Sequence, residues 1–233
     1  MKPLYAIMLD GEFCRRKLFG ELNRNVGANG VRQVIRAEHI MAHIEGIKTL
    51  PCVAEYELLR AYFYDCEPMD GAVDKPVTGE SWDLTGTVRY RNAASTLDRL
   101  RQAEDVAVRL GHLVGKRFPW RLKESAIRRL IEQNGREHNL QDADFSMDIQ
   151  QKGVDMRIGL DIARLALREM VRCVVVITGD SDFVPAFKFA RREGVRVVLV
   201  TMGHNVRPEL TEHADLVVRE PVLGPNEMAA PAG

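Results

Sequence analysis

The chain has 233 residues, of which 45% are hydrophobic and 28% charged, which is enough for one large domain or two small ones. Lysine plus arginine and aspartate plus glutamate balance at 33 each, which excludes a global basic field for nucleic acid and an acidic surplus typical of disorder. No stretch approaches the ~18 uninterrupted apolar residues of a membrane-spanning helix, so we expect no contact with a membrane.

The cysteines and the N-terminus indicate a reducing compartment. Cys14, Cys52, Cys66 and Cys173 show no CxxC pairing, so we interpret them as core residues. The first residues, MKPLYAIMLDGEF, hold too short an apolar run for a signal peptide, and Asp10 interrupts it. We therefore expect a cytoplasmic protein.

Apolar runs alternate with helical patterns in the first half of the chain. The expected elements, in order, are a strand at Tyr5–Leu9, helical spacing over Val31–Ile44, a strand at Leu58–Tyr64, a loop excursion at residues 66–88 and a helix at Arg89–Leu110. Gly, Pro and Asp break all periodicity within the excursion.

The second half continues this alternation. It predicts strands at His112–Phe118 and Phe145–Gln151 separated by the mixed-charge segment Arg121–His138, a strong amphipathic helix at Asp155–Met170, a strand at Arg172–Thr178, a helix at Phe183–Glu193, a strand at Val195–Met202, a helix at Val206–His213 and a strand at Leu216–Val218. Strands alternating with helices predict a Rossmann-like α/β fold, with a mostly parallel sheet and helices on both faces. We expect residues 1–219 to form a single domain and residues 220–233 to be a flexible tail.

Acidic residues follow the predicted strands where a parallel sheet brings strand ends together. Asp10 ends the first strand, and Asp180 with Asp182 follows the strand Arg172–Thr178. Asp155 begins the strong helix, where helix capping is the simpler interpretation. Because ligands bind beyond the carboxyl ends of parallel strands, we expect these four carboxylates at one end of the sheet.

Such a cluster predicts a metal site. Neighbouring carboxylates raise one another's pKa unless a cation compensates, and oxygen ligands suit Mg²⁺ or Mn²⁺, which can support phosphodiester cleavage. The alternative is that Asp180 and Asp182 are only turn and cap residues. Asp161 lies six residues beyond Asp155, so an ideal helix rotates it away from the site unless Asp155 is a cap.

Three motifs also occur in a fixed order. They are LDGEF at residues 9–13, KGVD at residues 152–155 followed by Asp161, and TGDSDFVP at residues 178–185. Together with YFYD at residues 62–65 and HADLVV at residues 213–218, they resemble the NYN domain of the PIN-like nuclease superfamily, specifically its LabA-like bacterial branch. The resemblance covers most of the chain and implies a Rossmann-like sandwich, a Mg²⁺ or Mn²⁺ site and ribonuclease activity.

Carried over by position, the resemblance implies particular site residues. The implied catalytic metal ligands are Asp10, Asp155, Asp180 and Asp182, with Asp161 in support. Many relatives carry an asparagine shortly after the first aspartate, where this chain has Phe13, so the substrate contact of that asparagine stays open here.

Cations and aromatic residues are candidates for binding RNA. Arg15, Arg16 and Lys17 could hold phosphate groups from a loop after Asp10, although a solvated charge run explains them as well. Lys152 and Ser181, beside the acidic residues, complete the substrate-binding candidates in this region.

A second candidate RNA contact is the segment GKRFPWRLK at residues 115–123. It interleaves four cations with Phe118 and Trp120, which could stack on unpaired bases, although a partly buried loop gives the same pattern. His112, His138 and His204 lack metal-ligand spacing and are interpreted as surface or structural residues.

Three classes of function remain open. The first is a metal-dependent endoribonuclease. The second is a haloacid-dehalogenase-like phosphatase, because GDSDF also resembles an acidic motif of that family, although its nucleophile strand needs two aspartates and this chain offers Asp10 and Glu12. The third is a non-catalytic RNA-binding or regulatory module. A neutral chain with a local patch favours single-stranded or looped RNA, and the oligomeric state, homo-oligomers included, stays open.

Overall fold

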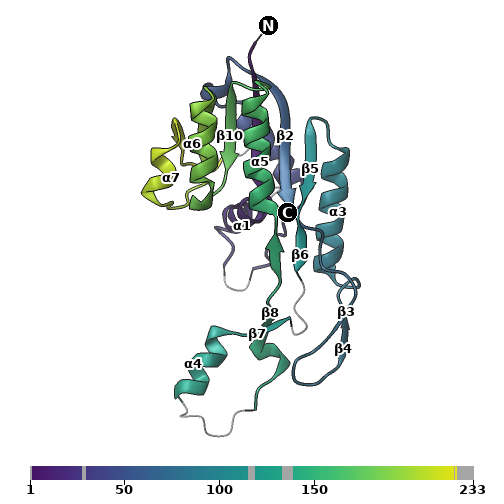
Figure 1. Ribbon diagram of the computed structural model, residues 1–233. Helices are drawn as coiled ribbons and strands as arrows, with labels where there is room; N and C mark the ends of the chain where they lie inside the picture. The colour runs from purple at the N-terminus through teal and green to yellow at the C-terminus, as the bar shows by residue number, and fades with distance from the viewer. Residues whose placement is uncertain (1, 28–29, 115–118, 133–138, 223, 225–233) are drawn as a thin grey trace.

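The structure, a computed structural model, describes residues 2–27, 30–114, 119–132, 139–222 and 224. Its centre is a six-stranded sheet formed by β1 (Leu4–Asp10), β2 (Glu57–Asp65), β5 (Val106–Leu110), β10 (Cys173–Ile177), β11 (Arg196–Val200) and β12 (Leu216–Val218). The order is β12–β11–β10–β1–β2–β5, and all neighbouring strands are parallel. Figure 1 shows β10, β2 and β5 of this sheet between the helices. The predicted α/β fold with a mostly parallel sheet is therefore confirmed.

Side chains of each strand alternate between two helical layers. Ile7 and Leu9 face the layer of α1 (Gly11–Leu22), α2 (Ala37–Lys48) and α3 (Val88–Gln102). Met8 and Val176 face the layer of α5 (Val154–Leu167), α6 (Val184–Arg192) and α7 (Pro208–Glu212). Because both faces of the central strands are covered, their sequences are continuous apolar runs.

The strand order reverses between β1 and β10. From β1 the chain continues to β2 and β5 on one side, whereas β10, β11 and β12 extend the sheet on the other side. Loops beyond the carboxyl ends of two such diverging strands leave a crevice, which is where open parallel sheets bind ligands.

Some predicted elements are wrong in extent, and two helices, at residues 11–22 and 124–132, are missed. The helix expected over Arg89–Leu110 ends at Gln102, because Val106–Leu110 is the edge strand β5 and pairs with β2. The strand expected at Phe145–Gln151 is two short strands, β8 (Phe145–Met147) and β9 (Gln150–Lys152). They pair with different partners, β7 (Trp120–Leu122) and β6 (His112–Val114). Residues 11–22, for which no element is predicted, form α1.

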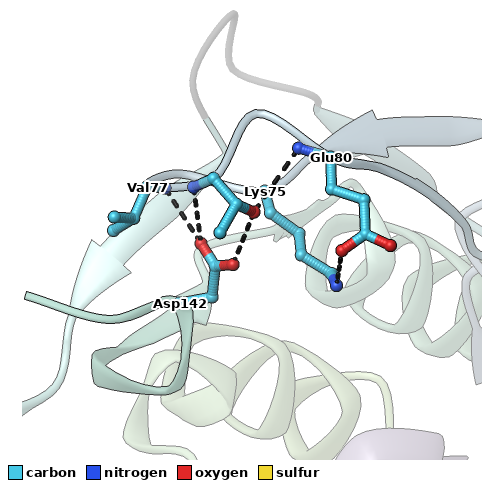
Figure 2. Close-up of polar contacts among 5 residues, drawn as sticks. Lys75, Val77, Glu80 and Asp142 are labelled. Atoms are coloured by element: carbon cyan, nitrogen blue, oxygen red, sulfur yellow. Dashed lines mark hydrogen bonds and ion pairs between the residues drawn. The ribbon is translucent and has the colours of Figure 1, made fainter.

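A small lobe projects beyond the carboxyl ends of the sheet (Figure 1). It contains the hairpin of β3 (Ala72–Asp74) and β4 (Ser81–Asp83), the β7–β8 pair and α4 (Glu124–Glu132), so the predicted loop excursion carries a hairpin. Asp142 accepts hydrogen bonds from the backbone amides of Val77 and Thr78, at 2.9 and 3.3 Å (Figure 2). Trp82 stacks on Trp120, with ring centroids 6.2 Å apart. These contacts join the hairpin to the rest of the lobe.

The start of the predicted tail is tied to α2. Nδ1 of His43 donates to the carbonyl of Val222, and the amide of Gly224 donates to the carbonyl of Ala42 over 2.9 Å. Residues 223 and 225–233 lie outside the described residues. In the part of the chain that the structure describes, no helix is long and apolar enough to cross a membrane.

Candidate functional site

A cavity of about 740 Å³ opens at the carboxyl ends of β1 and β10, where the strand order reverses. Its lining comes from the residues after these two strands, from β9 and the first turn of α5, and from the connection between β11 and α7. The carboxylates that line it are Asp10, Glu12, Asp155 and Asp180. The cavity therefore brings together acidic residues that lie far apart in the sequence.

Asp10 is positioned by the N-terminus of α1. Its Oδ1 accepts a hydrogen bond from the amide of Phe13 at 3.1 Å, and its Oδ2 accepts one from the hydroxyl of Thr178 at 3.3 Å. A Cβ atom on Gly11 would lie 2.4 Å from the carbonyl oxygen of Tyr64, so only glycine lets the helix start this close to β2. The LDGEF motif thus fixes Asp10 as both a helix cap and a cavity residue.

Asp180 follows β10 and caps the helical turn that comes next. Its Oδ1 accepts from the amide of Asp182 at 2.9 Å, and its own amide donates to the hydroxyl of Thr178 at 3.2 Å. The capping role considered as an alternative is therefore present, and it coexists with a place in the cavity lining. Asp182 is exposed and does not itself line the cavity.

Asp155 belongs to the first turn of α5 and does not cap it. The cap is Gly153, whose φ of 81° lies in the left-handed region that favours glycine. Because Asp155 is helical, Asp161 is rotated out of the cavity lining. Asp161 instead accepts a hydrogen bond from the hydroxyl of Tyr64 at 2.9 Å, and the Nε of Arg109 lies 3.6 Å from it.

The cavity carboxylates disfavour one another's ionisation. The pKa of Asp10 is raised to about 6, mainly by burial and then by the charges of Asp155 and Glu12. The pKa of Asp155 is also raised, by burial first and then by Asp180 and Asp182. A cation bound among these side chains would remove both penalties.

The chemistry of these carboxylates suits a bound metal ion, whereas their present spacing does not form a metal-binding group. Oxygen donors that repel one another suit a hard divalent cation. Across the described ranges, however, no group of three or more His, Cys, Asp or Glu side chains is arranged to hold a metal ion. The residues fit Mg²⁺ or Mn²⁺ by chemistry, and the side chains as they stand do not form a closed ligand shell.

The three consecutive cations after Asp10 lie on α1, not on a loop. Arg15 pairs with Asp65, whose Oδ1 lies 3.0 Å from Nη2 of the guanidinium. Arg16 lines the cavity, and Nζ of Lys17 lies 5.8 Å from the ring centroid of Phe13. The three side chains therefore have different surroundings, and Arg16 is the one in the cavity lining.

Of the remaining candidate substrate-binding residues, some line the cavity and others do not. Lys152 and Ser181 line the cavity. Trp120 does not, because it lies in the lobe and stacks on Trp82. Phe118 lies outside the described residues.

Sequence patterns did not identify several polar residues of the cavity lining, among them Glu12, Gln150 and Gln151. Three more, His204, Asn205 and Arg207, follow β11. The ring of His204 contacts Phe13 edge-on, with ring centroids 5.7 Å apart. Gly179 leaves room for the His204 ring, because a Cβ atom at residue 179 would lie 2.5 Å from Cδ2 of His204. The signal that could have found the three residues after β11 is the one that pointed to the aspartates, namely their position after a parallel strand.

Of the comparisons with known proteins, the family match agrees with the motifs. A crystal structure of a protein of unknown function from Vibrio parahaemolyticus RIMD 2210633 is similar, with a TM-score of 0.49, 15% sequence identity and coverage of 93% of this chain and 92% of that chain. No curated protein matches this chain in sequence. The sequence model of the NYN domain matches residues 63–219, which is more than half of the chain. The chain therefore belongs to the NYN domain family, a family of nuclease-like domains with RNA-related functions.

Proposed function

We propose that the protein is a metal-dependent endoribonuclease that hydrolyses RNA phosphodiester bonds at the cavity. The observation that carries this proposal is the group of carboxylates at the ends of β1 and β10, whose negative charges are unfavourable without a cation. Membership of the NYN family supports it, because nucleases of this kind typically use divalent metal ions and bind RNA.

The ligands of Mg²⁺ or Mn²⁺ would be Asp10, Asp155, Asp180 and Asp182. The bonds that cap α1 and the turn after β10 leave lone pairs free on these carboxylates, since each oxygen has two. Asp161 is left out of this set because Tyr64 and Arg109 hold its carboxylate elsewhere. A bound divalent ion would supply an activated water and stabilise the charge that develops on the phosphate.

Other side chains of the cavity would orient the RNA. Lys152 offers a positive charge to a phosphate beside the carboxylates, and the hydroxyl of Ser181 can donate to a phosphate oxygen. Because the acidic residues line a recess, a flexible strand reaches them more readily than a rigid duplex. We therefore propose single-stranded or looped RNA as the substrate, with Trp120 of the lobe as a further contact for unpaired bases.

The test is cleavage of an unstructured RNA oligonucleotide in the presence and absence of Mn²⁺. Wild type should cleave it only with metal, and Asp10→Asn and Asp180→Asn should each lower the rate by about 100-fold or more, because they remove ligand charge. Glu104→Gln is the matched control, since it removes an exposed carboxylate outside the cavity lining and should leave the rate unchanged.

Two other outcomes would contradict the ribonuclease function. Metal-dependent hydrolysis of p-nitrophenyl phosphate without cleavage of RNA would indicate a phosphatase. Binding of RNA by the wild type without cleavage in Mn²⁺ or Mg²⁺ would indicate a non-catalytic module.

We also propose that residues 1–219 form a single domain located in the cytoplasm. The NYN match begins at residue 63, yet β1 pairs with both β2 and β10, so the residues before the match contribute a central strand of the same sheet. All four cysteines are free thiols, which suits a reducing compartment.

A further inference from the structure

Three basic side chains lie around the ring of Phe13, and two of them, Arg16 and His204, line the cavity. The guanidinium carbon of Arg16 lies 5.9 Å from the ring centroid, and Nζ of Lys17 lies 5.8 Å from it. The ring of His204 contacts Phe13 edge-on, at an interplanar angle of 61°. Arg207 also lines the cavity, three residues beyond His204. We call Arg16, Lys17, His204 and Arg207 the basic wall.

The positive charges of the basic wall act on one another. The pKa of Lys17 is lowered by burial and then by the charge of Arg16. The pKa of His204 is lowered by burial first and then by Lys17 and Arg16, so positive charges crowd this side chain. None of the ion pairs between described residues involves Arg16 or Arg207. An anion bound at the wall would relieve this repulsion.

Phe13 is a lining residue of the cavity that is almost completely covered by its neighbours. Its side chain is 3% exposed, which leaves no ring face for stacking on a base. A Cβ atom on Gly179 would lie 2.6 Å from Cε2 of Phe13, so the ring packs directly against the backbone that leads to Asp180. Contacts between cations and an aromatic ring favour placing the basic groups beside it. The basic wall and the acidic residues thus share one buried support.

We propose that the basic wall binds phosphate groups of RNA next to the scissile bond, with Phe13 as the positioning residue, a role that rests on the proposed ribonuclease function. Guanidinium groups match the geometry of phosphate oxygens, and ammonium and imidazole groups donate to them. An RNA backbone that enters the cavity would present one phosphate to the carboxylates and a neighbouring phosphate to the wall. Phe13 therefore acts through the cations that lie around its ring.

The test measures RNA binding without metal, which separates it from catalysis. The affinity of the full chain for a fluorescein-labelled unstructured RNA oligonucleotide is determined by anisotropy in EDTA over a range of salt concentrations. We expect Arg16→Ala and Arg207→Ala each to raise Kd about five- to tenfold and to lower the salt slope by about 0.7. Lys188→Ala is the matched control, because it removes an exposed cation of α6 outside the cavity lining, and it should change Kd by less than about twofold.

The positioning role of Phe13 has its own variant. Phe13→Leu keeps an apolar side chain and every charge, yet it should raise Kd by about two- to fivefold and lower the salt slope, because the cations lose their shared support. Thermal unfolding of the same variant shows whether the fold is intact. A folded Phe13→Leu protein with wild-type affinity and slope would contradict the positioning role.

Three results would overturn the assignment of the wall itself. They are the absence of metal-free RNA binding by the wild type, Kd values of Arg16→Ala and Arg207→Ala equal to that of Lys188→Ala, and displacement of the RNA by equimolar 5′-AMP, which would indicate a phosphomonoester site. Wall-dependent binding without any cleavage in Mn²⁺ would refute the ribonuclease function and leave phosphate binding in place.

Discussion

Arg15 and Asp65 form an ion pair that joins α1 to the end of β2. Nη2 of Arg15 donates to Oδ1 of Asp65 over 3.0 Å, and the amide of Cys66 donates to the same oxygen over 2.8 Å. The Asp65 side chain is 1% exposed, and burial lowers the pKa of Arg15. The pair therefore lies largely out of water, and neither partner can be removed without leaving the other uncompensated.

Arg15→Ala should lower the free energy of unfolding by about 3 kcal/mol, because it leaves a buried carboxylate without a counter-charge. Urea denaturation measures the loss. Arg24→Ala is the control, because Arg24 is exposed and its pairing with Glu21 should contribute less than about 1 kcal/mol. An Arg15→Ala protein of wild-type stability but weakened RNA affinity would contradict this structural role and return Arg15 to the phosphate-binding residues.

The central strands were predictable because they are covered on both faces. β1, β10 and β11 consist almost entirely of buried apolar residues, and no helical periodicity competes with that pattern. The edge strand β5 is only partly buried, and Arg109 within it is exposed, so its residues extend the helical pattern of α3 in the sequence. Its pairing with β2 decides its structure, and that pairing is not a local property.

The site was predictable to the extent that it depends on strand ends. Asp10 and Asp180 follow neighbouring strands, and the geometry of a parallel sheet is enough to bring them to one cavity. Arg15 follows two residues after the motif that holds Asp10, but its ion pair depends on Asp65, which is 50 residues away. Asp161 likewise bonds a tyrosine of β2 that no local pattern connects with it. Partners distant in sequence therefore limit what motifs can predict.

Mn²⁺ should raise the melting temperature of the wild type, because the folded chain binds the ion and the unfolded chain does not. Metal at 100 times its Kd corresponds to about 2.7 kcal/mol of stabilisation. Asp180→Asn should lose most of this shift. Asp10→Asn should raise the metal-free melting temperature, because it removes a poorly solvated charge and keeps a side-chain oxygen for the cap of α1.

Differential scanning fluorimetry with and without Mn²⁺ measures both effects. Glu104→Gln, which removes an exposed carboxylate outside the cavity lining, should respond to Mn²⁺ as the wild type does. Equal metal responses of Asp180→Asn and the wild type would leave the acidic residues without the proposed ion.

RNA that is already unpaired should be cleaved faster than a duplex. Cleavage of an unstructured oligonucleotide, a hairpin and a perfect duplex of the same sequence is compared in Mn²⁺. Trp120→Ala should slow cleavage of the two substrates with unpaired bases by about tenfold if its indole stacks on a base. Trp82→Ala is the control, because it disrupts the same stacked pair and leaves Trp120 in place. Faster cleavage of the duplex, or equal effects of the two tryptophan variants, would contradict base recognition by Trp120.

His43 connects α2 to the last described residues of the chain. Its side chain is fully buried, its Nδ1 donates to the carbonyl of Val222, and its Nε2 has no hydrogen-bond partner among the described residues. Burial lowers the pKa of His43 below the ordinary value of 6.5. Protonation would place a charged N–H group in the core without an acceptor, so the folded state favours the neutral ring.

The stability that depends on neutral His43 should therefore be complete above pH 6.5 and lost as the pH falls through the lowered pKa. His43→Asn keeps a donor near the position of Nδ1 and cannot titrate, although its smaller side chain should lower the melting temperature at every pH. The melting temperature of the wild type should exceed that of His43→Asn by the largest margin at pH 7 to 8. This difference in melting temperature should shrink toward pH 5. His112→Asn replaces an exposed histidine and should retain the pH dependence of the wild type. If the difference in melting temperature between the wild type and His43→Asn stays constant from pH 8 to pH 5, His43 does not control this acid sensitivity.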